Sequence, residues 1–239
     1  MRLTIDFEMS EEKIPKDYRR GFASLIKNAI ENCNPGLYKH YYSGEFKMKP
    51  FTFGIYFPEG TKKNGDDFYV GKQFKLNFST SSIELATHIY NGSLHLKKDG
   101  YKLFDNIVKP TRSFLHRNYE ITKNEILFKT LSPILVITKG SNIKEYPKYL
   151  LPGEEGFHEG LEFAIRECAK EFLRIETDFE FKVEIKAYKK VPVWHYNQWM
   201  SSFNGIIEIK SIPEVLQMIY DIGLGVRRSQ GFGMLEVVG

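Results

Sequence analysis

The segment at residues 223–233, GLGVRRSQGFG, has the residue types of a loop that binds phosphate: four glycines and two adjacent arginines within eleven residues. Glycine lets the backbone adopt positive φ and approach another molecule closely, and the N–H groups of such a loop form a concave anion site. Forked guanidinium groups match phosphate oxygens. We therefore predict that this loop contacts a phosphate backbone. The residues assigned to that contact are Gly223, Gly225, Arg227, Arg228, Ser229, Gln230, Gly231 and Gly233.

The glycine spacing in this loop matches neither of two common nucleotide-binding motifs. A dinucleotide-binding fingerprint opens a helix, whereas this loop precedes the strand expected at residues 234–238. A P-loop needs Gly-Lys-Ser/Thr, which the segment does not contain. A glycine-rich turn with incidental arginines stays open as the structural alternative.

The elements that must hold this loop follow one order in the first half of the chain. Leu3, Ile5 and Phe7 alternate as in a strand, and residues 15–33 then switch to helical spacing. Asn34-Pro35-Gly36 ends that helix. The elements expected next are an extended segment at 51–57, a hairpin loop at 58–67, a strand at 74–78, a helix capped by Ser81 or Ser82, and strand with turns at 101–122, bent at Pro110.

The second half repeats that order. A strand at residues 127–138, interrupted by Ser132-Pro133, precedes an amphipathic helix at 156–173. Strands are expected at 179–185 and 206–209, followed by a short helix that Ser211 caps. The glycine-rich loop and a last strand complete the chain.

Strand, helix, two strands, helix and strand, occurring twice, predict an α+β fold of two tandem ferredoxin-like (RRM-like, βαββαβ) domains. We expect an N-terminal domain at residues 1–125 and a C-terminal domain at 126–239 that carries the glycine-rich loop. The halves share no visible sequence identity, so the repeat is architectural. A single mixed domain is the alternative.

Composition bounds the function without fixing it. The net charge of +4 permits a polyanionic partner but does not require one. Cys33 and Cys168, the only cysteines, fall on apolar stripes of expected helices and are interpreted as reduced core residues. The N-terminus alternates like a strand, and no apolar run approaches the ~20 residues of a membrane span, so we expect a cytoplasmic protein without a membrane partner.

Three segments in order carry a family resemblance. Residues 223–235, GLGVRRSQGFGML, resemble the C-terminal glycine-rich motif of the repeat-associated mysterious protein (RAMP) superfamily. LSPILV at residues 131–136 and NPGLYKHYYSGEFKMKPFTFG at residues 34–54 are similar to segments of one branch, the CRISPR-associated (Cas) family six endoribonucleases. The resemblance implies paired ferredoxin-like domains, as the element pattern also predicts.

The implied activity is cleavage of pre-crRNA within a CRISPR repeat into guide crRNA, without metal or other cofactor. The 2′-hydroxyl of the RNA attacks the neighbouring phosphate and leaves a cyclic phosphate and a 5′-hydroxyl. The expected partner is repeat RNA, with a CRISPR effector complex and a homodimer left open. One alternative is a non-catalytic RAMP-type RNA-binding subunit. Another is a ferredoxin-like scaffold without RNA, against which the arginine loop argues.

The resemblance also implies where the catalytic groups lie. Family members place a histidine after the first helix and a lysine further on, and the matching segment here offers His40, then Lys47 and Lys49. His40 precedes Tyr-Tyr-Ser-Gly, so we expect it in a loop. We assign His40 as general acid or base, because the histidine pKa lies near working pH, and Lys49 as the phosphate stabiliser.

The sequence departs from the family pattern in two places. Lys27 precedes Asn-Ala-Ile of the first helix, where members can have a catalytic tyrosine. Aligned without a gap from Asn34-Pro35, Tyr42 takes the place of the histidine, whereas a short gap restores His40. The catalytic set is therefore His40 with Lys27 and Lys49, a tyrosine-based variant, or incomplete.

Other basic and aromatic residues carry weaker signals. His88 has apolar neighbours in an expected helix and is interpreted as structural. His195 lies in WHYNQW at residues 194–199, which could stack bases, although aromatic clusters usually pack in cores. Basic residues at 97–98, 109–112 and 186–190 either line a groove for RNA or form ordinary solvated surface.

Overall fold

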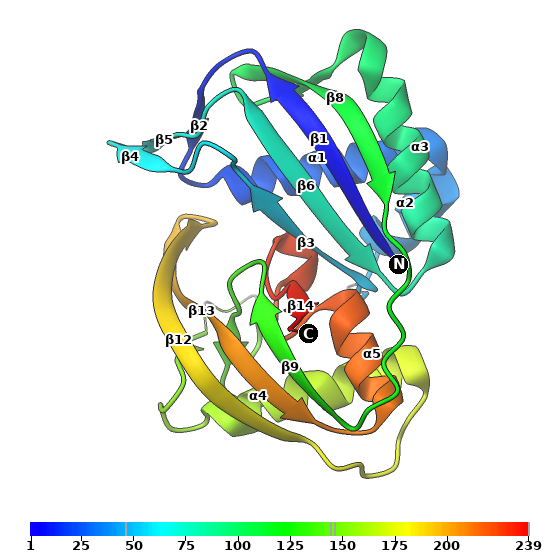
Figure 1. The fold of residues 1–239 in the computed structure, drawn as a ribbon, viewed down its shortest axis with the longest axis vertical. Helices are drawn as coiled ribbons and strands as arrows, with labels where there is room; N and C mark the ends of the chain where they lie inside the picture. Colours follow the sequence, from blue (N-terminus) through cyan, green and yellow to red (C-terminus); the bar gives the residue numbers. More distant parts are fainter. Residues whose placement is uncertain (46, 144, 146, 239) are drawn as a thin grey trace. The chain divides into compact units, whose positions relative to one another are not determined.

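The computed structural model describes residues 1–45, 47–143, 145 and 147–238. They form two compact units, Met1–Lys49 with Gly54–Asn118, and Pro50–Phe53 with Tyr119–Gly239. Both units combine helices with strands (Figure 1), which confirms the α+β prediction. The first unit ends at Asn118, and the domain boundary predicted near residue 125 stays a prediction.

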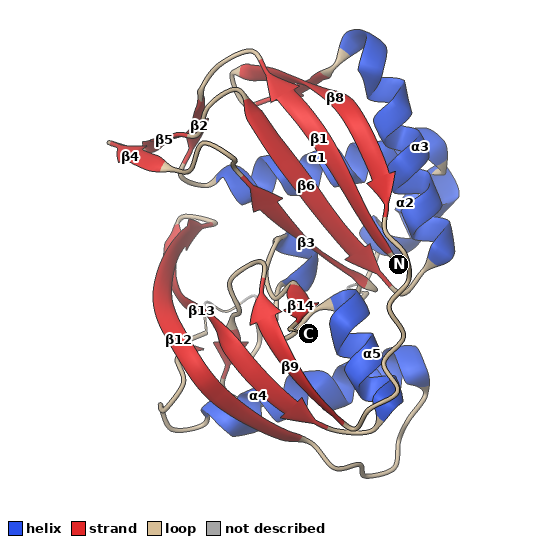
Figure 2. Cartoon of the chain, in the orientation of Figure 1, coloured by secondary structure: helices blue, strands red, loops and turns tan. Residues whose placement is uncertain are grey.

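The first unit is built on a sheet in the order β3-β6-β1-β8-β7. In chain order its main elements are β1 (Arg2–Met9), α1 (Tyr18–Cys33), α2 (Pro35–Tyr42), β3 (Phe51–Tyr56), β6 (Gln73–Thr80), α3 (Ile83–Asp99), β7 (Tyr101–Leu103) and β8 (Asn106–Leu115). A small separate sheet joins β2 (Lys13–Pro15), β5 (Asp67–Tyr69) and β4 (Lys62–Asn64). Helices α1 and α3 cover one face of the larger sheet (Figure 2).

Period-two alternation on β1 produces the core of this unit. Leu3, Ile5 and Phe7 are all buried, as the sequence predicts. Phe7 stacks on Phe74 of β6 with ring centroids 4.8 Å apart, and Phe22 of α1 meets Phe74 at 4.9 Å. These three rings fix α1 against the sheet, and α1 is the helix that carries Lys27.

The second unit is built on a sheet in the order β12-β13-β9-β14. In chain order its elements are β9 (Glu125–Thr130), β10 (Val136–Ile137), β11 (Tyr149–Leu150), α4 (Phe157–Cys168), a π-helix (Ala169–Leu173), β12 (Lys182–His195), β13 (Gln198–Lys210), α5 (Pro213–Ile222), a 3-10 helix (Arg228–Gln230) and β14 (Leu235–Val237). Strands β10 and β11 pair separately. Among the described residues of both units, no helix is long and apolar enough to span a membrane.

Both units follow the same path. The main strands of the first unit, β1, β3, β6 and β8, and those of the second, β9, β12, β13 and β14, lie in the spatial order second, third, first, fourth. A helix follows the first and the third strand of each set. The βαββαβ order predicted for each half is therefore present in both units.

Helix α2 is a correction to the sequence analysis. Asn34-Pro35 ends α1 as expected, but it also begins a second helix: the Asn34 side chain accepts a hydrogen bond from the Leu37 N–H (2.9 Å), and Pro35 occupies the first helical position. Asparagine at the N-cap and proline at the first position both favour a helix start. The expectation that His40 lies in a loop was wrong, because His40 lies near the end of α2.

Smaller expectations also failed. Strand β4 lies inside the segment expected as a loop at residues 58–67. Ser211 does not cap α5, since its hydroxyl donates to the Glu180 carbonyl (2.8 Å) and Ile212 occupies the N-cap position. Strands β12 and β13 are much longer than the strands expected at 179–185 and 206–209.

Candidate active site and glycine-rich loop

Two lysines contact one tyrosine in the first unit. Tyr42 is the last residue of α2, Lys27 comes from α1, and Lys49 comes from the segment just before β3. The ammonium groups of Lys27 and Lys49 each lie 4.8 Å from the centroid of the Tyr42 ring. The fold therefore brings together three of the four residues assigned as candidate catalytic groups, which we call the Tyr42 cluster (Lys27, Tyr42 and Lys49).

The surroundings shift the proton affinities within this cluster. Burial raises the pKa of Tyr42 well above its usual value, with smaller contributions from Tyr38 and Tyr41, so its hydroxyl is protonated at neutral pH. Burial lowers the pKa of Lys49, and the positive charge of Lys27 lowers it further. An anion such as a phosphate group, bound beside the two lysines, would raise the pKa of Lys49 again and so offset the effects of burial and of the Lys27 charge.

His40 lies at the outer end of the same group of side chains. It is exposed, its ring contacts that of Tyr41 (4.9 Å), and the Lys47 ammonium donates to its Nδ1 (3.3 Å). The Lys49 ammonium donates to the Lys47 carbonyl (3.3 Å), which connects His40 to the Tyr42 cluster through the 47–49 segment. Its assignment as general acid or base remains a prediction.

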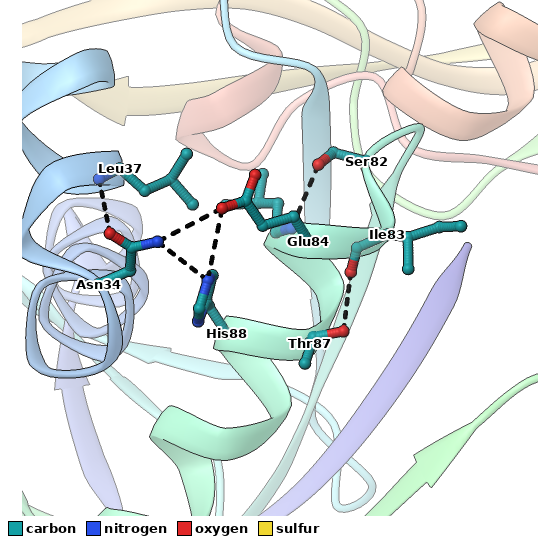
Figure 3. Close-up of polar contacts among 8 residues, drawn as sticks. Asn34, Leu37, Ser82, Ile83, Glu84, Thr87 and His88 are labelled. Atoms are coloured by element: carbon teal, nitrogen blue, oxygen red, sulfur yellow. Dashed lines mark hydrogen bonds and ion pairs between the residues drawn. The ribbon is translucent and has the colours of Figure 1, made fainter.

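Helix α2 is fixed at its start by a polar contact with α3. The side-chain amide of Asn34 lies 3.1 Å from His88 Nε2 and 3.3 Å from Glu84 Oε1, while its oxygen caps α2 (Figure 3). His88 and Glu84 themselves approach to 3.7 Å. Sequence reasoning interpreted His88 as structural but missed that it holds the residue from which α2 begins. The direction of α2 sets where His40 and Tyr42 lie.

The arginines of the glycine-rich loop are engaged within the second unit. Arg227 donates to the Tyr149 hydroxyl (2.8 Å), to Gln230 Oε1 (3.0 Å) and to the Ile143 carbonyl (3.0 Å). Arg228, only 9% exposed, donates to the Cys168 sulfur and to the Gly225 carbonyl. These contacts stabilise the loop. They favour the structural alternative for Arg228, while the contact of the loop with a phosphate backbone stays a prediction.

The four glycines are required by the path of this loop. Gly223, Gly225, Gly231 and Gly233 all have φ between 75° and 89°. A Cβ at Gly225 would overlap the Leu135 carbonyl, and one at Gly233 would overlap the Leu224 carbonyl. The four glycines that suggest a ligand site are therefore also explained by the backbone conformation of the loop alone. Ser229 and Gln230 are half-buried in the short 3-10 helix between these glycines.

Among the residues that the structure describes, no group of three or more His, Cys, Asp or Glu side chains is placed to hold a metal ion. The chemistry that the Tyr42 cluster supports directly is that of phenol and ammonium groups: a proton donor beside two cations. This set suits stabilisation of a phosphate and transfer of a proton to a departing oxygen.

Comparison with known proteins finds relatives over most of the chain. Residues 116–237 match the family model described as CRISPR associated protein Cas6, C-terminal. The CRISPR-associated endoribonuclease Cas6 of Pyrococcus furiosus is 27% identical over 95% of this chain and 84% of its own length. The CRISPR-associated endoribonuclease Cas6 1 of Methanocaldococcus jannaschii is 24% identical over 98% of this chain and 92% of its own length.

Solved structures agree on the fold. A Cas6-related protein of Pyrococcus furiosus has a TM-score of 0.85 at 20% identity and covers 100% of this chain and 98% of its own. A structure described as a RAMP protein binding different RNA substrates has a TM-score of 0.83 at 18% identity, with 100% of both chains covered. At such identities the likeness supports the fold alone, and it agrees with the fold that the family resemblance implied.

Proposed function

The chain belongs to the Cas6 family of CRISPR-associated proteins, and from that premise we propose that it is an endoribonuclease that cuts pre-crRNA within the CRISPR repeat. The two relatives above are both named as CRISPR-associated endoribonucleases, and the chain covers most of each. The observation within this molecule that carries the proposal is the contact of the Lys27 and Lys49 ammonium groups with the Tyr42 ring.

The proposed reaction is metal-independent transesterification. The 2′-hydroxyl of one nucleotide attacks the adjacent phosphorus, the bond to the 5′-oxygen breaks, and the products are a cyclic phosphate and a 5′-hydroxyl. Lys27 and Lys49 hold the scissile phosphate and stabilise the charge that grows on its oxygens. Their paired charges, costly when no anion is present, become favourable when the phosphate binds.

Two proton transfers complete the reaction. The Tyr42 hydroxyl, protonated at neutral pH because burial raises its pKa, donates to the departing 5′-oxygen. The ammonium groups of Lys27 and Lys49 contact the ring of the same tyrosine. His40, linked to the cluster through Lys47, accepts the proton of the 2′-hydroxyl. This assignment joins the histidine-based and tyrosine-based alternatives in one site.

The test is cleavage of end-labelled repeat RNA by purified protein in excess chelator. The same RNA is tested with a single 2′-deoxy nucleotide at each position in turn. We expect one discrete cut that a single deoxy substitution abolishes, with a cyclic phosphate on the upstream product. Cleavage that survives every deoxy substitution would overturn 2′-hydroxyl attack, and cleavage that requires added metal would overturn metal independence.

A second candidate is a non-catalytic RNA-binding subunit of a CRISPR effector complex. The observation that favours it is the departure from the family pattern: Lys27 lies where members can have a catalytic tyrosine, and Tyr42 takes the place of the histidine when the sequences are aligned without a gap. Such a protein would bind repeat RNA stably and yield no product in the same assay. A homodimer is compatible with either function.

A further inference from the structure

Resting on the proposed function, we infer that the tip of the β12–β13 hairpin is a platform on which unpaired bases of the RNA stack. The platform consists of Trp194, Tyr196 and Trp199, called the aromatic tip below. Its occupant is a single-stranded RNA segment. Aromatic rings accept bases of any sequence, and the lysines nearby contact the phosphates.

The hairpin ends in a tight turn beside which Tyr196 and Trp199 are exposed and Trp194 is half-buried. Trp194 pairs with Trp199 and His195 with Gln198, which leaves Tyr196 and Asn197 as a two-residue turn. Both turn residues have positive φ, 48° and 59°, the conformation of a type I′ turn. Trp199 is 57% exposed and Tyr196 is 42% exposed. A tyrosine in this backbone region is uncommon, and here its ring packs against that of His195 (4.5 Å between centroids) and leaves its other side exposed.

The opposite face of the tip is anchored in the core. Val193 and Met200 belong to a buried cluster with Phe232, and His195 is completely buried. The His195 Nε2 donates to Gln230 Oε1 (3.1 Å), which ties the tip to the glycine-rich loop. The tip is therefore fixed on one side and open on the other. The two tryptophan rings, 5.3 Å apart, are held ready for a ligand instead of completing the core.

Charge decides which occupant fits. From residue 187 to residue 207 the chain carries Lys189 and Lys190 and no aspartate or glutamate, whereas Lys186 forms ion pairs with Glu184 and Glu208. Lys189 and Lys190 are exposed on β12, and strand alternation places Lys190 on the same face as Trp194. The Arg227 guanidinium lies 6.0 Å from the Tyr196 ring. This hairpin end attracts a polyanion, whereas the tip of a second copy would meet it with like charge.

The chain offers a direct spectroscopic test, because Trp194 and Trp199 are its only two tryptophans. Tryptophan emission of the full protein therefore reports on the aromatic tip alone. We would titrate the protein with an unstructured oligouridylate of about 12 nucleotides, within the range that single-stranded binding folds occupy. The expected result is quenching that saturates and that weakens as salt rises.

Variants separate stacking from size and from folding. Trp199→Leu keeps an apolar side chain but removes the ring, and we expect at least roughly tenfold weaker binding. Trp199→Phe keeps a ring and should keep most of the affinity. The matched control is Tyr119→Leu, at a tyrosine of the same unit that is 47% exposed, and its affinity should not change.

Each outcome bears on the inference separately from the proposed function. Quenching with loss of affinity in Trp199→Leu supports the platform even if repeat RNA is never cut, in which case the proposed function fails alone. Normal cleavage, without quenching and with wild-type affinity in Trp199→Leu, overturns the platform and leaves the function standing. If Trp199→Leu instead converts a sedimenting dimer to monomer with RNA affinity unchanged, the tip is an interface between copies and the inference is overturned.

Discussion

The ammonium group of Lys49 lies 4.8 Å from the centroid of the Tyr42 ring. These residues belong to segments that the sequence does not show to be adjacent: the end of α2 and the stretch that leads into β3. Burial lowers the pKa of Lys49 and raises that of Tyr42, so each group is moved towards its neutral form. Half-buried titratable groups with shifted pKa values are expected where proton transfer occurs.

Tyr42→Phe removes the proton donor and keeps the ring that the two lysines contact. We expect the single-turnover rate to fall by about 10²–10⁴-fold, as for loss of a general acid, with RNA affinity unchanged. Tyr41→Phe, on the preceding residue of the same helix, is the matched control and should cut normally. Wild-type cleavage by Tyr42→Phe would remove this residue from the mechanism.

His40→Ala removes the proposed acceptor of the 2′-hydroxyl proton. We expect a loss of about 10²–10⁴-fold in the single-turnover rate while binding survives. His95→Ala is the control, at an exposed histidine of α3. If His40→Ala cuts at the wild-type rate, His40 has no part in the mechanism and the tyrosine-based alternative holds.

The lowered pKa of Lys49 predicts an alkaline limit to activity. As pH rises through that pKa, which lies below the ordinary lysine value of 10.5, the ammonium becomes neutral and its attraction for the phosphate is lost. Cleavage rates measured against pH should fall on the alkaline side. Lys49→Arg keeps its charge and should move the fall to higher pH. An unmoved fall in Lys49→Arg would assign it to another group.

Asn34 offers a way to separate capping from cross-linking. Asn34→Ala removes the cap of α2 and its contacts with Glu84 and His88, and should destabilise the unit by ~1 kcal/mol and lower the cleavage rate. Asn34→Ser keeps a capping oxygen but cannot reach both α3 side chains. If the cross-link positions α2, Asn34→Ser should melt near the wild-type temperature yet cut slowly. Normal cutting would limit Asn34 to capping.

Local sequence patterns were enough to predict those parts of the fold in which a single helix or strand packs against one core. Leu3, Ile5 and Phe7 are buried because alternate residues of a strand point to the same face of the sheet, and that face lies against the core. Ser82 caps α3 by accepting from the Leu85 N–H, as a serine before an apolar periodic run predicts. The glycines were also identified correctly as positive-φ positions.

The remaining features depend on context that no local pattern contains. Asn34-Pro35 can both end one helix and begin the next. Whether a second helix follows depends on the path of the chain after Pro35, which the local sequence does not show, so α2 was missed. The lengths of β12 and β13 depend on how the two strands pair with each other, and this pairing continues as far as His195 and Gln198. Arg228 was assigned to the phosphate contact, because no local pattern shows that its side chain meets Cys168, 60 residues away in the sequence.

Arg228 therefore supports the last prediction, which separates structure from RNA contact in the glycine-rich loop. Its hydrogen bonds to Cys168 and Gly225 are buried, and bonds made by charged groups contribute ~1.5–3 kcal/mol each. Arg228→Leu should lower the unfolding midpoint by several degrees and leave the salt dependence of RNA binding unchanged. Lys190→Ala, at an exposed position, should leave the midpoint unchanged and reduce the salt slope by about 1 if it contacts a phosphate. A slope reduced by the same amount in Arg228→Leu would mean that this loop opens on binding and presents its arginine to the RNA.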